Sequence, residues 1–128
     1  MKKSLFSGVA FAAMLALSGN AYADLLIGVG GPLTGPNAAF GAQLQKGAEA
    51  AIAEINAAGG VQGRSLRLTV LDDQYQPDTA LQNVRRLADQ DGVFAITGGV
   101  GTQNFVGALP YVNRAKIPAV APYAPSNQ

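Results

Sequence analysis

The chain has 128 residues with neither cysteine nor histidine, and nine basic against eight acidic residues give it a net charge of +1. The absence of these two residue types excludes Ser-His-Asp and Cys-His catalysis, the usual zinc sites and a disulfide framework within this chain. Because the charges are nearly balanced and form no run of one sign, nucleic acid and anionic membranes are poor candidates for a partner.

The first 23 residues have the three parts of a secretory signal peptide. Lys2 and Lys3 form a positive start, residues 5–17 are uncharged and mostly apolar, and residues 21–23 (Ala-Tyr-Ala) form a small-x-small cleavage site. A membrane anchor needs ~20 predominantly apolar residues, and this segment is shorter. A lipid anchor would need a cysteine after the cleavage site. We therefore expect a cleaved signal peptide and a soluble, exported chain.

The segment that follows predicts a strand and a long helix. Residues 25–29 are a short apolar run, typical of a buried strand, and they lead into a glycine-rich loop at 28–32. Apolar residues then recur three and four positions apart from Leu44 to Ile55, which predicts an amphipathic helix. Two glycines after Ala58 can adopt left-handed conformations, so we expect the helix to end there.

Three further elements follow in the same alternation. Residues 66–71 predict a second strand, and Pro77 is well placed for the first turn of a second helix. Residues 93–96 predict a third buried strand. The apolar face of the second helix is expected to consist of Leu81, Val84, Leu87 and Ala88.

A third helix and a fourth strand complete the pattern. Phe105, Leu109 and Val112 predict the helix, and Pro110 inside it is expected to kink or shorten it. Residues 119–121 predict a short strand. The alternation of strands and helices predicts an α/β fold in which a parallel sheet has helices on both faces.

Ligands of such sheets bind beyond the carboxyl ends of the strands. In this chain those ends are residues 30–41, 72–76, 98–103 and 122–128. Functional residues are therefore expected in these four segments.

A glycine-rich turn after the first strand and an acid after the second would fit a dinucleotide site. The spacing fails, since a count from Gly28 places Gly30 correctly but Leu33 where the third glycine belongs. No Gly-Lys-Ser/Thr triplet follows any turn, which disfavours a phosphate loop. We expect no cofactor, and we interpret Asp72 and Asp73 as structural residues that bond nearby backbone amides.

The turn at residues 98–102 has a clearer functional potential. It joins the third strand to the third helix, so the amides near Thr102 and Gln103 are expected to point outward at the positive end of a helix dipole. Together with the Thr102 hydroxyl they could bind a small carboxylate, because each charge-assisted hydrogen bond contributes about 1.5 to 3 kcal/mol. The alternative is that Thr102 only caps its helix.

The order and spacing of several short motifs resemble those of a known family. These motifs are IGVGGPLTGP at 27–36, Phe40-Gly41, Gly47-Ala48, IAEINAAGG at 52–60, Gly63, LDD at 71–73, and Gly98 with Gly101-Thr102. Together they resemble the periplasmic Leu/Ile/Val-binding proteins, which are the solute receptors of ABC-type amino-acid importers. The resemblance covers residues 24–128 and implies the type I periplasmic binding fold, in which two α/β lobes close over a ligand.

The resemblance also implies a ligand site. Thr102 matches the residue whose hydroxyl and amide bind the α-carboxylate of the ligand, and Gly101 lies beside it in the same motif. Tyr123 matches a residue whose backbone carbonyl binds the α-ammonium group, and Phe40 matches an aromatic wall of the side-chain pocket. These residues form the expected ligand site.

The sequence departs from the family in two places. Pro125 stands where the family has a second hydroxyl ligand, and Ser126 could take over that role after a small shift. Because Pro125 has neither a hydroxyl nor an amide proton, another amino acid, an amide or another small carboxylate stays open beside a branched-chain amino acid. Secondly, the disulfide of some relatives would join the positions of Tyr75 and Gly101, and both cysteines are absent.

The family's chains are much longer than this one. Residues 24–128 are therefore expected to form an incomplete N-terminal lobe behind the signal peptide at 1–23. The predicted function is that of a monomeric, non-enzymatic solute-binding component that captures a small ligand in the periplasm and delivers it to an ABC permease. The alternatives are a periplasmic ligand sensor of the same fold and a truncated product without activity.

Overall fold

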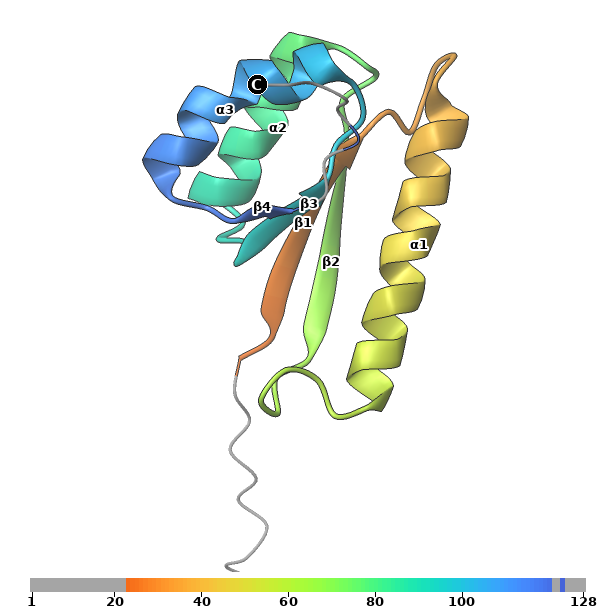
Figure 1. Cartoon of the computed structure of the whole chain (residues 1–128), viewed down its shortest axis with the longest axis vertical. Coiled ribbons are helices and arrows are strands. Elements are labelled where there is room, and N and C mark those ends of the chain that lie inside the picture. Colours follow the sequence, from red (N-terminus) through yellow and green to blue (C-terminus); the bar gives the residue numbers. More distant parts are fainter. Residues whose placement is uncertain (1–22, 121–122, 124–128) are drawn as a thin grey trace, which may run out of the picture.

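The computed structural model describes residues 23–120 and Tyr123. Within this part of the chain, strands and helices alternate in the predicted order (Figure 1). Four strands, β1 (Leu25–Gly31), β2 (Leu66–Asp72), β3 (Ala95–Gly98) and β4 (Ala119–Val120), form one parallel sheet in the order β2-β1-β3-β4. The predicted α/β fold with a parallel sheet is confirmed.

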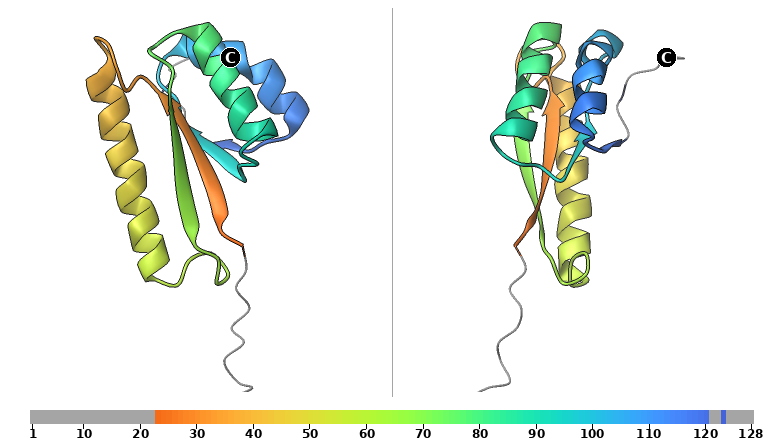
Figure 2. Two further views of the ribbon diagram at one scale, coloured as in Figure 1. Left: turned by 180° about the vertical axis from the view of Figure 1, so that it is seen from behind. Right: turned by 90° about the vertical axis from the view of Figure 1, so that its left-hand side faces the viewer.

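Three helices cover the sheet within the described residues. Helix α1 (Ala38–Ala57) lies on one face, whereas α2 (Pro77–Asp89) and α3 (Thr102–Ala115) pack side by side on the other face (Figure 2). Pro77 occupies the first turn of α2, as predicted, where its missing N–H costs no intrahelical hydrogen bond. No helix in the described ranges has the length and apolar character that a bilayer crossing requires.

The bounds of β1, β2 and β3 differ from the prediction. Strand β2 ends at Asp72, one residue beyond the predicted 66–71. Strand β1 continues to Gly31, because its last residues keep their parallel pairing with β2. Strand β3 was predicted at 93–96 but spans Ala95–Gly98. The reason is that the Val93 amide donates to the Leu87 carbonyl at the end of α2, so Val93 belongs to the turn that closes this helix. Residue 121, the predicted end of β4, lies outside the described residues.

Pro110 was expected to kink or shorten the third helix, and the second of these two expectations is wrong. Helix α3 runs from Thr102 to Ala115 with Pro110 inside it, and it ends at Lys116 in a left-handed conformation. A proline in a helix interior removes one backbone hydrogen bond and costs about 3 kcal/mol. Here the helix is kept by burial of residues on both sides of the proline, Ala108 and Val112, between α2 and the sheet.

The apolar core lies between the sheet and the pair α2 and α3. Leu87, Val93 and Ile96 are buried at its centre, and Leu87 is 1% exposed. Four partly buried side chains pack against this centre. They come from two strands, from α2 and from the α3–β4 connection: Leu26, Leu71, Val84 and Ile117. This face therefore holds the strands in place, so that their carboxyl ends form one edge.

Candidate functional site

The loops at the carboxyl ends of the strands surround an open depression of about 240 Å³. The β1–α1, β2–α2 and β3–α3 connections all reach this edge (Figure 1). Tyr123 is joined to the β3–α3 connection by a parallel β-bridge with Val100. The residues that line the depression are Asn37, Phe40, Tyr75, Val100, Gly101, Thr102 and Tyr123. Four of the five residues expected at the ligand site are thus brought together, and Ser126, like Pro125, lies outside the described residues.

Gly101 has a backbone conformation that only glycine adopts readily. Its φ is +101°, and a Cβ atom at this position would lie 2.9 Å from the Tyr75 ring. Gly101 is the N-cap residue of α3, and the helix begins at Thr102. The alternative in which Thr102 itself is the N-cap residue is therefore wrong, and Thr102 occupies the first helical position, at the positive end of the helix dipole.

Tyr123 is joined to the β3–α3 turn by its backbone. Its amide donates to the Gly99 carbonyl at 2.8 Å, and its carbonyl accepts from the Gly101 amide at 3.1 Å. Val100 and Tyr123 form a parallel β-bridge between these bonds. The Gly101 amide is thereby occupied, whereas the Tyr123 carbonyl keeps a second lone pair with which it can accept another donor.

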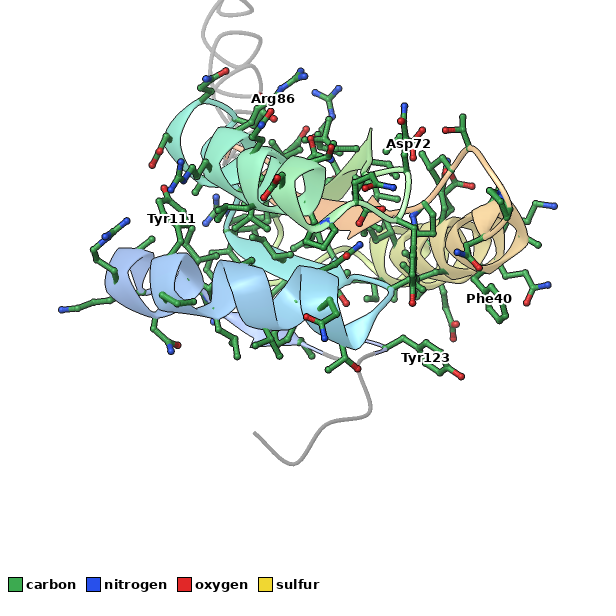
Figure 3. All side chains as sticks on the ribbon, turned by 90° about the horizontal axis from the view of Figure 1, so that it is seen from above. Phe40, Asp72, Arg86, Tyr111 and Tyr123 are labelled. Atoms are coloured by element: carbon green, nitrogen blue, oxygen red, sulfur yellow. The ribbon has the colours of Figure 1, made fainter. Side chains whose placement is uncertain are left out.

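Aromatic rings flank the depression. Phe40 in the first turn of α1 is 55% exposed, Tyr123 is 62% exposed, and Tyr75 is 43% exposed. Figure 3 shows Phe40 and Tyr123 at the end of the molecule away from Tyr111. Phe40 and Tyr123 also border an adjoining hollow, with Gln43, Leu44 and Val100. Three exposed rings around one concave edge are suited to covering an apolar ligand side chain.

Asn37, Tyr75 and Val100 line the depression but were not predicted as site residues. Asn37 and Tyr75 fall in segments expected at the carboxyl ends of strands, so their ranges were predicted although the individual residues were not. For Tyr75 the one signal is the disulfide of some relatives, which would join its position to that of Gly101. No local pattern predicts its place, because its ring reaches the site through an unusual backbone. Gln74 and Tyr75 have φ values of 51° and 61°, in the left-handed region.

The two aspartates before Tyr75 stabilise this loop. The Asp72 carboxylate accepts from the Gln74 amide at 2.9 Å, and the Asp73 carboxylate accepts from the Tyr75 amide at 2.8 Å. Each aspartate thus bonds the amide two residues on, which is the turn that this residue type favours. The interpretation of Asp72 and Asp73 as structural residues is confirmed.

Each aspartate also bonds a second segment at the same edge. Asp72 accepts from the Leu33 amide at 2.8 Å and from the Thr34 hydroxyl at 2.6 Å, and so joins the β1–α1 loop. Asp73 accepts from the Asn104 side chain at 3.3 Å, in the first turn of α3. The pair therefore connects the β1–α1 loop, the β2–α2 loop and the first turn of α3.

The two carboxyl groups differ in their electrostatics. Burial would raise the pKa of Asp72, but hydrogen bonds from the Thr34 hydroxyl and three backbone amides outweigh it, so this pKa lies below its ordinary value. Burial raises the pKa of Asp73 above its ordinary value, against the opposing hydrogen bonds from Tyr75 and Asn104. None of the seven described lining residues carries a formal charge. Within the described lining, the N-terminus of α3 is thus the feature that can attract an anion.

No group of three potential metal-binding side chains is found among residues 23–120 and 123. The lining combines one helix N-terminus, an available backbone carbonyl and apolar rings. Such a set suits binding of a small polar molecule with an apolar part.

Known proteins are similar to this chain in sequence and in fold. Residues 25–128 match the family described as Periplasmic binding protein. The chain is 51% identical over 98 residues to the Leu/Ile/Val-binding protein homolog 1 of Brucella abortus, an alignment that covers 77% of this chain and 26% of the relative. It is 39% identical over 126 residues to an amino acid binding protein of Pseudomonas aeruginosa, covering 95% of this chain and 34% of that protein.

Solved structures with a similar fold come from the same class of binding protein. The branched-chain amino acid transporter substrate binding protein LivJ of Streptococcus pneumoniae, in complex with isoleucine, superposes with a TM-score of 0.77 at 30% identity, over 81% of this chain and 30% of that one. A solute binding protein of an ABC transporter from R. palustris, in complex with 4-hydroxybenzoate, has a TM-score of 0.68 at 27% identity, over 75% and 26%.

The chain spans about a quarter to a third of the length of the relatives and structures it matches. Within that span, the sequence match, the sheet and the order of its elements agree. The chain therefore belongs to the periplasmic binding protein family, among the relatives of the Leu/Ile/Val-binding proteins and of the solute-binding components of branched-chain amino acid ABC transporters.

Proposed function

We propose that residues 24–128 supply part of the N-terminal lobe of a solute receptor, and that this lobe binds the carboxylate of a small amino acid or a related acid in the depression. The observation that carries the proposal is the convergence of Phe40, Gly101, Thr102 and Tyr123 on one hollow. These residues are up to 83 positions apart in the sequence and meet only because the strands end at a common edge.

A carboxylate fits the N-terminus of α3 for an electrostatic reason. The first amides of a helix have no intrahelical partner and carry about half a positive charge together with the helix dipole. Thr102 adds a hydroxyl at the first helical position. No charged side chain lines the described part of the depression, so the helix end is the feature of the site that favours an anion.

The remaining parts of an amino acid also find partners. The Tyr123 carbonyl accepts one hydrogen bond from Gly101 and can accept a second from an ammonium group. Phe40, Tyr75 and Tyr123 supply the apolar wall for a side chain. The ligand class of choice is therefore a small acid with an apolar body.

The ligand identity is proposed at the level of this class. The relative of known structure from S. pneumoniae holds isoleucine, and the one from R. palustris holds 4-hydroxybenzoate. Both compounds pair a carboxylate with an apolar part. A branched-chain amino acid is the first choice because the Brucella relatives are named for leucine, isoleucine and valine.

The proposal extends to the setting of the receptor. Residues 1–23 would direct export as a cleaved signal peptide, and the ligand would be delivered to an ABC permease in the inner membrane without covalent chemistry. The family membership and the names of the transporter components among its relatives support this role.

A titration followed by NMR tests the binding proposal. The ¹⁵N-labelled chain, purified after export, is titrated with L-isoleucine, with 4-hydroxybenzoate and with L-isoleucinamide, which lacks the carboxylate. We expect the acids to shift the amide signals of Thr102 and Gln103 with a Kd in the millimolar range, about −4 kcal/mol, because a single lobe offers only part of a closed site. L-Isoleucinamide should cause smaller shifts of these signals.

Two variants serve as a matched pair in this titration. Thr102→Val keeps the shape of the side chain but removes its hydroxyl, and should raise the Kd for isoleucine at least threefold, about the loss of one modest hydrogen bond. Thr69→Val makes the same change in the middle of β2, away from the depression, and should leave the Kd unchanged. Absence of any shift at Thr102 and Gln103 with both acids would rule out the proposed carboxylate site.

A further inference from the structure

Asp73 is a buried carboxylate between two of the segments that line the depression. Its exposed fraction is 2%, and that of its partner Asn104 is 5%. One carboxylate oxygen accepts from the Tyr75 amide at 2.8 Å, and the other accepts from the Asn104 side-chain nitrogen at 3.3 Å. Asp73 therefore contacts the β2–α2 loop and the first turn of α3 at once.

Both partners of Asp73 are directly connected to the candidate site. Tyr75 holds a left-handed backbone conformation with φ of 61°, which leaves its ring against Gly101. Asn104 lies two residues after Thr102 in the first turn of α3. A movement of either partner would change the relative position of the Tyr75 ring and the helix N-terminus.

Asp73 is also a costly residue at this place. A carboxylate loses its hydration when buried, and only hydrogen bonds to both oxygens offset the loss. Burial raises the pKa of Asp73 in spite of these bonds. An apolar residue would avoid the cost but could not accept from donors in two different segments.

We propose that Asp73 is a positioning residue of the site: its carboxylate ties the β2–α2 loop to the first turn of α3, and thereby holds the Tyr75 ring against Gly101 and aims the α3 N-terminus into the depression. The consequence for carboxylate binding rests on the proposed function above. The tie itself does not, and it can be measured without any ligand.

The first measurement is amide hydrogen exchange of the exported chain without ligand, in Asp73→Ala and in Asp72→Ala. The Phe105 amide bonds the Gly101 carbonyl, and the Gly101 amide bonds the Tyr123 carbonyl. Loss of the tie should speed exchange of these two amides about tenfold or more in Asp73→Ala, while the core amides of Val93 and Ile96 change less.

Asp72→Ala is the matched control, because Asp72 makes the same kind of turn but bonds the β1–α1 loop instead of α3. It should leave the exchange of the Phe105 and Gly101 amides unchanged. Asn104→Ala provides a second route, since it removes the far end of the tie while Asp73 stays in place, and it should reproduce the effect if Asp73→Ala does not fold.

The second measurement is the titration with L-isoleucine and with 4-hydroxybenzoate. Asp73→Ala and Asn104→Ala should each raise the Kd about threefold to tenfold, and the double variant should lose little more than either single change, because both delete one tie. Asp73→Asn should restore most of the affinity, since its amide oxygen can accept from Tyr75 and its NH₂ group can donate to the Asn104 side-chain oxygen.

The outcomes separate the two proposals. If the unmodified chain binds neither acid but Asp73→Ala loosens the α3 start selectively, the proposed function fails and the tie stands. If exchange rises uniformly through the core amides, or not at all, in both Asp73→Ala and Asn104→Ala, Asp73 is not a positioning residue. Normal exchange with weakened binding would also contradict the tie.

Discussion

The two faces of the sheet are covered very differently. On one face, α2 and α3 enclose a core around Leu87, which is 1% exposed. On the other, α1 is the longer helix, yet among its residues only Gly41 is buried. A groove of about 360 Å³ remains open between α1 and the sheet, lined by apolar residues that include Leu44, Ala48 and Ile52.

This difference indicates a division of roles. Burial of apolar area is the main source of stability, so the α2 and α3 face is expected to hold most of it. Helix α1 is attached at both ends: Gly41 approaches the backbone of Pro32, and the Asn56 side chain exchanges two hydrogen bonds with the backbone of Leu66. The depression lies where the two faces meet, since its lining includes residues from the start of α1 and from the start of α3.

The largest effect is expected for Leu87→Ala. This change removes a fully buried side chain from the centre of the core and should lower the free energy of unfolding by about 2 to 5 kcal/mol. Urea unfolding of the exported chain, followed by circular dichroism, measures it. A loss below about 1 kcal/mol would show that the α2 and α3 face is not the main source of stability.

Gly41→Ala should give the next largest effect, and it tests the other face. A Cβ atom at Gly41 would lie 1.9 Å from the Pro32 carbonyl oxygen, which is backbone and must shift. We expect a loss of about 1 to 3 kcal/mol in unfolding free energy. Gly47→Ala in the same helix is the control, because nothing lies within 4 Å of its Cβ position. It should stabilise the chain by about 0.5 to 1 kcal/mol.

Ile52→Ala sharpens the comparison with Leu87→Ala. Ile52 is only half-buried and lines the open groove beside α1. Its truncation leaves no closed cavity, so the same measurement should show a loss of about 1 kcal/mol or less. A loss equal to that of Leu87→Ala would mean that the groove is closed in solution and that both faces contribute alike.

The smallest effect concerns the two adjacent aspartates at the shared edge. The pKa of Asp72 is lowered in the folded chain, so its contribution to stability is present above its ordinary pKa and is lost as the pH falls. The pKa of Asp73 is raised, so its contribution is present at low pH and is lost as the pH rises through the folded pKa.

Urea unfolding between about pH 3 and pH 7 tests this contrast with Asp72→Asn and Asp73→Asn. The stability difference between the unmodified chain and Asp72→Asn should grow as the pH rises. The difference from Asp73→Asn should change in the opposite direction. Parallel pH dependences of the two variants would contradict the assigned directions of the pKa shifts.

Much of the fold was predictable from local patterns. The alternation of apolar runs and helical periodicity predicted the parallel sheet, and Pro77 marked the start of α2 correctly. The errors fell where tertiary contacts decide. Val93 reads as a strand residue but bonds back to α2, and Pro110 was expected to kink or shorten its helix but lies in a 14-residue helix with buried residues on both sides of it.

The candidate site was predictable in part. The motif around Gly101 and Thr102 correctly predicted the start of a helix, and the binding of an anion there stays a prediction. Tyr75 could not be found in this way, because its ring reaches the depression only through two left-handed residues. Those conformations depend on carboxylates whose second hydrogen bonds go to other segments, and no local pattern encodes such bonds.

By itself the sequence determined the order of strands and helices, the segments in which the strands end and the lack of cysteine and histidine side chains in this chain. Residue periodicity and composition are properties of short segments, so they can be read from the sequence without knowledge of the fold. Only the tertiary structure decided which face of the sheet is enclosed, and how Asp72 and Asp73 join three loops. Burial and long-range hydrogen bonds depend on segments that are distant in sequence, and these exist only once the chain has folded.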